Sequence, residues 1–473
     1  MTALQQLQHD SAPAGAQDLG TRLHALLAKY DSAAPRYTSY PPIPYWGPLE
    51  GGTVADWLAG PGAAGDASLS LYTHIPFCRS RCHYCGCFVV ITPHQEPAER
   101  YLNAVHREME LVAARLGPGR PVHQYHLGGG TPNFISPTAM ERLVSRARAL
   151  FRFQDDIEMS IEVDPRHLSP AELKHLRALG FNRLSLGIQD FDEQVQAGVN
   201  RVESYEHVRE LVVAARREGF LGINFDLIYG LPHQTRERFR RTVQRVLALA
   251  PDRLALYNFA YLPQAFPHQR KMDAEALPDA EEKLAIFLAA RGLFLGNGYQ
   301  AIGLDHFARN DDELARAYRT GTMRRNFMGY TTQAGTDLLA FGVSGITEFN
   351  GRFWQNEKKL VAYQRVVESG RIPAVRGLLL DAEDRLRQAV VAGLFCQGVV
   401  DFAALNARFG LNVHAHFAQE LGLLEPLRDD GLIELSAERL AVTEMGQFFL
   451  RNIAVVFDNR TRQGAPVTFS RTV

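Results

Sequence analysis

The chain has 473 residues, with 51 Lys and Arg against 52 Asp and Glu, and its formal net charge of −1 argues against a protein that coats nucleic acid, which would carry a basic excess. Hydrophobic residues make up 46% of the chain and charged residues 22%, a globular mixture that predicts about three folded units. Four of the five cysteines lie between residues 78 and 87, which favours a metal or redox centre over a disulfide framework.

The N-terminal region predicts neither export nor a membrane anchor. Residues 1–15 lack the basic start and the apolar stretch of a signal peptide. No apolar run in the sequence approaches the 18 residues that a membrane-spanning helix needs. We therefore expect a cytoplasmic protein that does not insert into a membrane.

A proline-rich arm follows an amphipathic stretch over residues 21–30. Residues 31–47 contain four prolines, which exclude a regular helix, interleaved with tyrosines, Trp46 and Arg36. Two interpretations stay open: the arm packs on a neighbouring domain, or it forms a flap over a site. Residues 58–67 predict a linker, so we expect an N-terminal arm and linker over residues 1–66.

Between residues 68 and 305, β-rich runs alternate with helical periodicity in six βα units. The expected strands lie at 68–75, 122–128, 157–163, 182–188, 223–230 and 253–259, and the helices at 97–115, 137–150, 169–178, 203–218, 235–248 and 280–296. Residues 299–305 predict a last short strand. This repeat implies an α/β fold with a parallel sheet and right-handed crossovers. Six units rather than eight indicate an incomplete (β/α)6 TIM-like barrel, which we expect over residues 67–350.

The pattern becomes mainly helical towards the C-terminus. Helices are expected at 381–397, 399–408 and 413–428, followed by a strand pair and a last helix over residues 445–457. This order resembles a winged-helix domain, a common scaffold in DNA binding. Residues 411–473 contain six Arg and no Lys against eight Asp and Glu, a balance that argues against a DNA-reading surface. We expect a winged-helix-like cap over residues 351–473 and no nucleic-acid partner.

The cysteine-rich loop begins where the first expected strand ends. Cys78, Cys82 and Cys85 form a C-x₃-C-x₂-C pattern, and thiolates are the normal ligands of [4Fe–4S] clusters. Three cysteines would leave one iron free to bind a small molecule. A zinc site stays open as an alternative, with Cys87, His74 or His83 as the fourth ligand. A thioredoxin-like Cys82–Cys85 dithiol is a further, weaker alternative.

Glycines and polar residues follow the ends of the other expected strands. Gly128, Gly129 and Gly130 permit a close approach of the backbone to a polar ligand. The later strand ends supply Glu162, Gln189, Asp226 and Ala260. Because catalytic groups of such barrels lie at the C-terminal ends of the strands, we expect a shared ligand pocket at this rim.

These motifs resemble the radical S-adenosylmethionine (SAM) superfamily, and more closely the oxygen-independent coproporphyrinogen III oxidase family. The resemblance rests on PRYTSYP, LYTHIPFCRSRCHYCGC, HLGGGTPNFIS, SIEVDPR, LSLGIQDF, DLIYGLP, GYQAIGLDHFAR, NFMGYTTQ, DLLAFGVSGIT and RNIAVVFD. It runs from about residue 28 to the C-terminus. It implies a partial barrel of the radical SAM type.

The resemblance implies a [4Fe–4S] cluster held by Cys78, Cys82 and Cys85, with SAM on the fourth iron. Of the residues implied to contact this SAM, Tyr72 would pack near its sulfonium, where an aromatic face suits a cation. The others are Gly129 at the methionine portion, Glu162 at the ribose, and Ala260 and Ile346 beside the adenosine. For Ala260 and Ile346, simple core packing is the alternative.

A second SAM molecule is also implied. Its expected contacts are Tyr84, Gly86, Gly130, Thr131, Gln189, Arg201 and Asp226, and Cys87 falls beside this site rather than on an iron. The residues expected to take part in catalysis are Tyr72, Cys87, Glu162 and Phe327. Met328 follows Phe327 where the family is expected to carry Gln, so an amide hydrogen bond is missing there.

The implied reaction is the anaerobic oxidative decarboxylation of two propionates of coproporphyrinogen III to vinyl groups by 5′-deoxyadenosyl radical chemistry. The product is protoporphyrinogen IX, in haem biosynthesis. We expect an unidentified electron donor and acceptor as partners, and a monomer. The basic residues expected to pair with the substrate carboxylates are Arg36, Arg270, Lys271, Arg309, Arg324 and Arg325.

Two other functions stay open. A non-enzymatic haem carrier of the same family would share the cluster loop and the glycine motif, but we expect it to lack Cys87 and the YTSYP arm. A radical SAM enzyme acting on another tetrapyrrole is the second.

Overall fold

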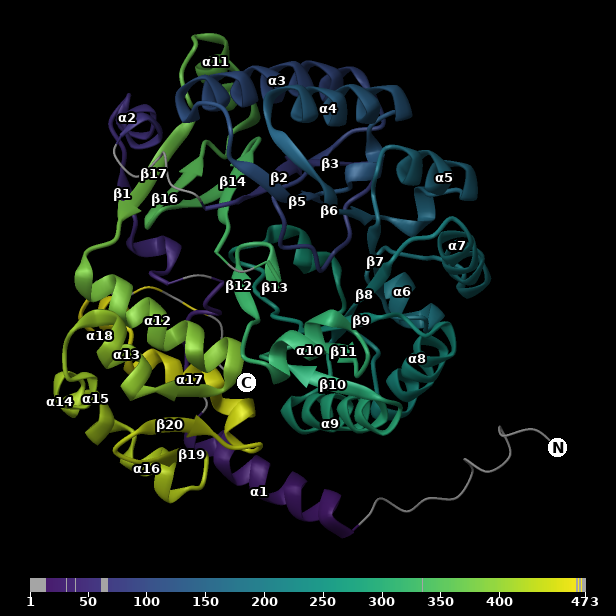
Figure 1. Ribbon diagram of the computed structural model, residues 1–473. Coiled ribbons are helices and arrows are strands. Elements are labelled where there is room, and N and C mark those ends of the chain that lie inside the picture. The colour runs from purple at the N-terminus through teal and green to yellow at the C-terminus, as the bar shows by residue number, and fades with distance from the viewer. Residues whose placement is uncertain are drawn as a thin grey trace.

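A 13-stranded sheet, curved but not closed, forms the centre of the molecule (Figure 1). The computed structural model describes residues 14–30, 32–38, 40–60, 67–333, 335–464, 467 and 469. The strand order is β1-β17-β16-β15-β14-β2-β5-β6-β7-β8-β9-β11-β10. Its middle, from β14 to β9, is entirely parallel.

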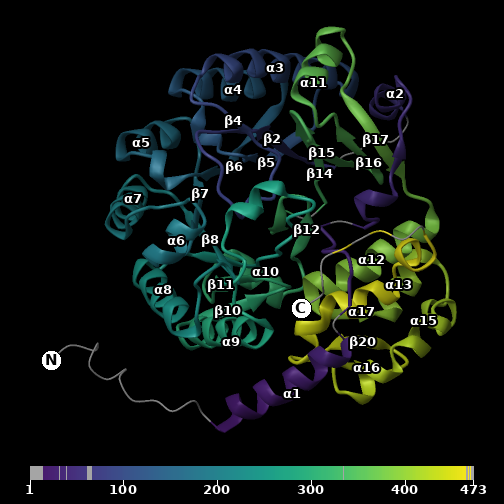
Figure 2. The same ribbon diagram turned by 180° about the vertical axis from the view of Figure 1, so that it is seen from behind.

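Six βα units build the parallel part of the sheet. The strands are β2 (Leu69–Ile75), β5 (Pro121–Gly129), β6 (Arg152–Val163), β7 (Arg183–Gln189), β8 (Gly222–Tyr229) and β9 (Arg253–Asn258). The crossover helices are α3 (Glu96–Leu116), α4 (Pro137–Leu150), α5 (Pro170–Ala178), α7 (Tyr205–Arg217), α8 (Arg236–Leu249) and α9 (Ala280–Gly296). Figures 1 and 2 show these helices on the outside of the curved sheet. The prediction of an incomplete six-unit barrel is confirmed.

Local sequence signals explain where these helices begin. The side chains of Ser136, Ser204 and Thr235 cap α4, α7 and α8 by accepting a hydrogen bond from a backbone N–H of the first turn. Ser169 and Glu172 form a reciprocal capping box at the start of α5. These caps set where each helix begins after the strand end that carries site residues.

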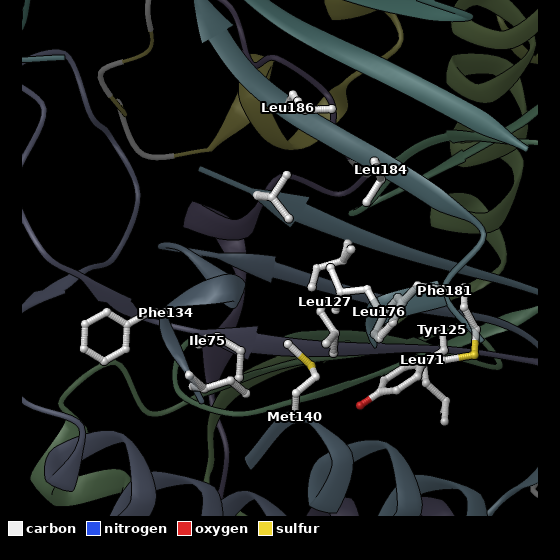
Figure 3. Close-up of a cluster of buried hydrophobic side chains, with 14 of the residues drawn as sticks. Leu71, Ile75, Tyr125, Leu127, Phe134, Met140, Leu176, Phe181, Leu184 and Leu186 are labelled. Atoms are coloured by element: carbon white, nitrogen blue, oxygen red, sulfur yellow. The ribbon is translucent and has the colours of Figure 1, made fainter. Parts of the chain in front are cut away.

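The core lies between the parallel strands and the helices. Figure 3 shows Leu71, Tyr125, Leu127, Leu184 and Leu186 of the strands beside side chains of the helices and loops. All five are at most 2% exposed. Since side chains alternate along a strand, their neighbours Tyr72 and His126 point to the opposite face, into the barrel.

The sheet continues beyond the six units on both sides. At one end, β10 (Tyr299–Ile302) and β11 (His306–Arg309) add an antiparallel pair next to β9. At the other end, β14 (Asp337–Phe341) runs parallel to β2, and the antiparallel strands are β15 (Ile346–Phe349), β16 (Arg352–Asn356), β17 (Ala374–Leu379) and β1 (Gly47–Pro48). The strands from β14 to β17 were not foreseen, because they are short and follow no βα repeat.

The remaining elements are short or lie at the periphery. Near the barrel are β3 (Phe77–Cys78), β4 (Val90–Ile91), η3 (Pro132–Phe134), η4 (Pro165–His167), α6 (Glu193–Gly198), η5 (Pro267–Lys271), α10 (Glu313–Arg319), β12 (Arg324–Asn326), β13 (Gly329–Thr331) and α11 (Leu360–Glu368). No helix in the described part of the chain combines the length and the apolar character needed to cross a membrane.

A mainly helical C-terminal domain follows, as expected. It contains α12 (Ala382–Gln397), α13 (Phe402–Phe409), α14 (Val413–His416), α15 (Ala418–Leu423), α16 (Glu425–Asp429), η6 (Gly446–Phe449), α17 (Leu450–Val456) and α18 (Asn459–Gln463). A small antiparallel sheet of β18 (Val399–Asp401), β20 (Arg439–Val442) and β19 (Ile433–Leu435) completes it. The predicted division at residues 66 and 350 stays a prediction.

The first part of the N-terminal arm packs on this C-terminal domain, whereas Val54 and Leu58 near its end are buried in the core of the barrel. Its elements are α1 (Ala14–Tyr30), η2 (Ile43–Tyr45) and α2 (Thr53–Ala59). The hydroxyl groups of Tyr37 and Tyr40 donate hydrogen bonds to Asp458 (2.9 Å) and Asn459 (2.8 Å). The start of the predicted linker instead ends α2, where Leu58 is buried, and residues 61–66 of that linker lie outside the described residues.

Candidate functional site

The ends of adjacent parallel strands bring the predicted site residues to one rim of the barrel. Tyr72 lies on β2, Gly129 ends β5, Glu162 lies near the end of β6, Gln189 ends β7 and Asp226 lies on β8. The register places these strands side by side in that order. Parallel strands present their carboxyl ends at the same edge, so Tyr72 and Asp226, 154 positions apart in the sequence, lie at one rim.

The cysteine loop is held against the glycine motif. Sγ of Cys78 lies 3.2 Å from Oγ1 of Thr131, and the backbone N–H of Gly130 donates to the carbonyl of Ile75 (2.9 Å). A Cβ atom at Gly130 would lie 2.8 Å from the backbone of Pro76 and 3.1 Å from Sγ of Cys78. Only glycine lets the two segments approach this closely. Burial raises the pKa of the Cys78 thiol to about 11.

A buried arginine pair lies next to Cys82. Nη2 of Arg166 and Nη1 of Arg201 donate to Sγ of Cys82 at 3.9 and 3.7 Å, and both guanidinium groups pair with Asp164, at 2.7 and 3.3 Å. Burial alone would raise the pKa of Asp164, but the two arginines outweigh it and lower the pKa. The two guanidinium groups therefore place positive charge beside the sulfur atom of Cys82.

The third and fourth cysteines of the loop interact with each other. A hydrogen bond from Cys87 to Cys85, opposed by burial, lowers the pKa of Cys85 to about 6. Nε2 of His268, in η5, lies 2.7 Å from the carbonyl oxygen of Cys85 and fixes the loop from the other side. In the described residues, no three Cys, His, Asp or Glu side chains converge as they would around a single metal ion.

Glu162 is the centre of a group of polar residues at the same rim of the barrel. Its Oε2 accepts a hydrogen bond from the backbone N–H of Gly129 (3.0 Å), and its Oε1 lies 3.3 Å from Nε2 of His126. Burial opposes the negative charge, but His126 and Gly129 together hold the pKa of Glu162 below its ordinary value. The ring of Tyr72 stacks on that of His126 at 5.8 Å, and its hydroxyl lies 3.0 Å from Nδ1 of His74. A charged carboxylate and an aromatic face therefore line the same space.

Gly129 has a backbone conformation that other residues rarely adopt. Its φ is +121°, and a Cβ atom there would lie 2.6 Å from the ring of His74. We expect Gly129→Ala to lower the urea midpoint of unfolding, because it adds about 1–3 kcal/mol of backbone strain and also displaces His74. Gly119→Ala is the matched control, with φ of +112° and no atom within 4 Å of the added carbon. Equal midpoints for the two variants would contradict the steric contact with His74.

A second group of predicted residues lies on the other side of Arg201. Tyr84 packs with the apolar cluster of Val195, Val199 and Phe259. Gln189 has a left-handed backbone with φ of +66°, and its buried Oε1 finds no hydrogen-bond partner among the residues that the structure describes. Nη2 of Arg201 donates to the carbonyl of Gly187 (2.5 Å). An unpaired buried amide oxygen is costly, so Gln189 is suited to receive a donor from a ligand.

Asp226, on the neighbouring strand β8, is the last of the polar residues on this side of the rim. It accepts hydrogen bonds from Ser185 and Asn224, both at 3.0 Å, while burial and the charge of Glu162 raise its pKa to about 6. Gly86 lies under Phe266, whose ring would be 3.9 Å from a Cβ atom there. A ligand with hydroxyl or ammonium groups can therefore find acceptors here and on Glu162.

The last three predicted residues lie towards the arm. The carbonyl of Ala260 accepts from Nε2 of Gln269 (3.3 Å), just after β9. Ile346, the first residue of β15, and Phe327 pack around Trp46 in one apolar cluster. The Phe327 and Trp46 rings are 6.0 Å apart. The backbone N–H of Met328 donates to Oδ1 of Asn326 (2.8 Å), which closes the β12–β13 turn without an amide side chain at position 328.

Three site residues were missed as functional candidates: His126, Asp164 and Arg166. All three stand in motifs already quoted, HLGGGTPNFIS and SIEVDPR, within four residues of Gly128 or Glu162. Their spacing carried no signal of its own, because their partners, Cys82 and Tyr72, are distant in sequence. Only the proximity to a recognised motif could have indicated them.

Comparisons with known proteins agree with this geometry. The Radical SAM superfamily model matches residues 72–246, and the HemN C-terminal domain model matches residues 380–449. An oxygen-independent coproporphyrinogen III oxidase of Salmonella typhimurium is 44% identical over 450 residues, which cover 95% of this chain and 98% of that protein. The chain belongs to the oxygen-independent coproporphyrinogen III oxidase family.

Further members of the oxygen-independent coproporphyrinogen III oxidase family are similar over the same length. The Escherichia coli protein is 43% identical over 95% of this chain and 98% of its own, and the Pseudomonas aeruginosa protein is 41% identical. The solved structure of coproporphyrinogen III oxidase (HemN) from Escherichia coli superposes with a TM-score of 0.87, covering 92% of this chain and 98% of that one. The chain is thus a radical SAM enzyme of this family, an oxidoreductase, as its motifs predicted.

Proposed function

We propose that this protein catalyses the oxygen-independent oxidative decarboxylation of coproporphyrinogen III to protoporphyrinogen IX. In each of two events, a propionate side chain loses CO₂ from its carboxylate and one hydrogen atom from its β-carbon, and one further electron leaves the substrate, so that a vinyl group remains. The observation that carries the proposal is the packing of Cys78, in the thiol loop, against the glycine motif, whose Gly129 donates a hydrogen bond to Glu162.

Cys78, Cys82 and Cys85 would hold a [4Fe–4S] cluster. The donor set fits, because all three are thiols in one short loop and two arginines donate towards Cys82. SAM would bind to the remaining iron, against Gly129 and Glu162. When bound, the cluster and SAM supply the one-electron chemistry that removes a hydrogen atom from the substrate.

The protein's own residues bind and orient these groups. Glu162 would accept hydrogen bonds from the two ribose hydroxyls, a role for which its lowered pKa keeps it charged. Tyr72 would cover the sulfonium with its ring. Ala260 and Ile346 would flank the adenosine. Phe327, whose ring packs on that of Trp46, would lie beside the substrate.

A second SAM molecule is part of the proposal. Its contacts would be Tyr84, Gly86, Gly130, Thr131, Gln189, Arg201 and Asp226. Support comes from the unpaired Oε1 of Gln189 and the carboxyl group of Asp226 on the same side of the chamber. Cys87 would lie between the two cofactor sites, where it donates to Cys85.

The remaining expectations join this proposal. We place the enzyme in the cytoplasm as a monomer, with an electron donor that reduces the cluster and an acceptor that takes the substrate electron. We also retain the division into an arm (1–66), a catalytic barrel (67–350) and a cap (351–473).

The direct test is an anaerobic assay of the reconstituted protein with SAM, a reductant and coproporphyrinogen III. We expect the release of two CO₂ molecules per substrate and the appearance of two vinyl groups by mass spectrometry. SAM cleavage without decarboxylation of this substrate would point to another tetrapyrrole and overturn the proposal. Stoichiometric haem binding without turnover would instead identify a haem carrier.

A further inference from the structure

A short loop joins β14 to β15 at the rim of the barrel. It covers residues 342–345 and ends at Ile346, the first residue of β15. Because β14 runs parallel to β2, with Phe341 opposite Thr73, the loop begins beside the carboxyl end of β2. The strand β2 carries Tyr72, so this β14–β15 loop lies next to the predicted cofactor contacts.

The backbone of the β14–β15 loop has an uncommon conformation. Gly342 and Ser344 both lie in the left-handed region, with φ of +96° and +61°. A Cβ atom at Gly342 would lie 2.9 Å from the carbonyl oxygen of His74, so only glycine lets the loop approach β2 this closely. A non-glycine residue such as Ser344 keeps a left-handed backbone only where its surroundings enforce it. The neighbours of the loop therefore determine its shape.

Glu108 of α3 is the residue on which the contacts of this loop converge. Its Oε2 accepts hydrogen bonds from the backbone N–H of Gly342 (2.7 Å) and the hydroxyl of Tyr363 (2.6 Å), and its Oε1 accepts one from Nδ2 of Asn356 (2.6 Å). The same Nδ2 also donates to the carbonyl of Gly342 (2.9 Å). Figures 1 and 2 show α11, which carries Tyr363, beside α3. Glu108 thereby connects α3, the loop, β16 and α11.

The carboxylate of Glu108 is buried in the core between α3 and the sheet. The residue is 1% exposed, and in the described part of the chain no cation lies within ion-pair distance of it. Burial raises the pKa of Glu108 to about 7, although its three hydrogen-bond donors oppose the increase. Burying a carboxylate costs free energy, and such groups are weak evidence for stability. What Glu108 provides is a fixed partner for the N–H of Gly342, which an apolar side chain would leave unpaired.

Tyr101 makes a second contact from the same face of α3. It precedes Glu108 by seven residues, or two helical turns. Its hydroxyl donates to the carbonyl of His74 (2.6 Å) and accepts from the backbone N–H of Val343 (3.0 Å). His74 is also the residue whose ring contacts the hydroxyl of Tyr72. The helix therefore holds the β14–β15 loop and the end of β2 in a fixed relation to each other.

We propose that Glu108 is a positioning residue for the adenosine side of the cofactor site. Its carboxylate fixes the backbone of Gly342, and the β14–β15 loop carries this constraint to Ile346, four residues later. Tyr101 keeps the loop aligned with β2. The inference rests on the proposed function, because Ile346 is proposed there to flank the adenosine of SAM.

The test is anaerobic calorimetric titration of the cluster-containing protein with SAM. Glu108→Gln keeps the shape of the side chain, but its amide nitrogen accepts no hydrogen bond. We expect SAM binding to weaken at least about tenfold, since a misplacement of about 1 Å can cost up to about 100-fold, while the iron content is unchanged. Competition with SAM by 5′-deoxyadenosine should weaken in parallel, whereas competition by L-methionine stays as in the wild type.

The matched control is Asp384→Asn, which changes an equally buried carboxylate in the C-terminal domain. Asp384 is 2% exposed and pairs with Arg460 of α18 at 2.6 Å. We expect this variant to lose stability to urea, as Glu108→Gln does, and still to bind SAM as the wild type does. Wild-type affinity in Glu108→Gln, or equal weakening in both variants, overturns the inference. Equal loss of competition by 5′-deoxyadenosine and L-methionine overturns it as well.

Tyr363→Phe decides the question if Glu108→Gln does not fold. It removes one of the three donors to Glu108 and keeps the ring in the core. We expect SAM binding about threefold weaker, as for the loss of one hydrogen bond, and wild-type affinity would overturn the inference. A wild type that binds SAM but releases no CO₂ from coproporphyrinogen III contradicts the proposed function alone, because the titration contains no tetrapyrrole.

Discussion

Replacing Cys78, Cys82 or Cys85 with Ser abolishes both the cluster and the enzymatic activity. A serine hydroxyl is a poor ligand for the irons of such a cluster, which are normally held by thiolates. Iron in the anaerobically reconstituted protein is expected to fall from about four atoms per chain towards zero. The measurement combines iron and sulfide analysis with the visible absorption band and the decarboxylation assay.

Cys87→Ser is the matched control for these variants. It makes the same atomic change two residues from Cys85, and serine can still donate the hydrogen bond that Cys87 gives to Cys85. We expect this variant to keep its iron and its absorption while turnover falls. Loss of iron in Cys87→Ser, or retention of the full cluster in Cys82→Ser, would show that the ligand set is assigned wrongly.

Glu162→Gln is expected to weaken SAM binding about 10- to 100-fold and to reduce turnover accordingly, without loss of iron. The amide keeps one acceptor oxygen, but it removes the charge and places an N–H₂ group where Gly129 and His126 now approach the carboxylate at 3.0 and 3.3 Å. Hydrogen bonds to charged groups are worth about 1.5–3 kcal/mol, which sets this range. Anaerobic calorimetric titration with SAM measures the change.

A surface carboxylate provides the comparison for Glu162. Glu141 of α4 is exposed on the outer helical layer, so Glu141→Gln should bind SAM as the wild type does. If Glu162→Gln also bound SAM within experimental error of the wild type, its proposed contact with the ribose would be refuted. Unchanged iron content in both variants would show that the effect is confined to the cofactor site.

The βα repeat was predictable because each of its strands and helices is specified by residues close together in the sequence. Each strand is a short β-rich run, and each helix carries its own cap and apolar period, as with Ser169 and Glu172 at the start of α5. The antiparallel strands from β14 to β17 have no such local pattern. Their pairing depends on register with distant strands, such as β1 with β17, and periodicity carries no information about it.

For the site, the sequence indicated which residue types take part, and the tertiary structure showed which residues they contact. Spacing alone indicated the three thiols, and the glycine run indicated a close approach of the backbone. The sequence alone could not indicate that Arg201 donates to Cys82, which is 119 residues away, or that Tyr37 donates to Asp458, which is 421 residues away. It also left open whether the arm is a flap, whereas the buried Tyr37 and Tyr40 show that it packs on the C-terminal domain.

What the sequence determined by itself was therefore the type of fold, the thiol loop and the family, since each resides in a contiguous segment. Only the tertiary structure decided which charges are balanced. Asp164 offsets Arg166 and Arg201 beside the thiols, while Lys283 of α9 donates to the neutral carbonyl of Phe259. The physical reason is that charge compensation depends on distance in space and on burial, and neither follows from the order of residues along the chain.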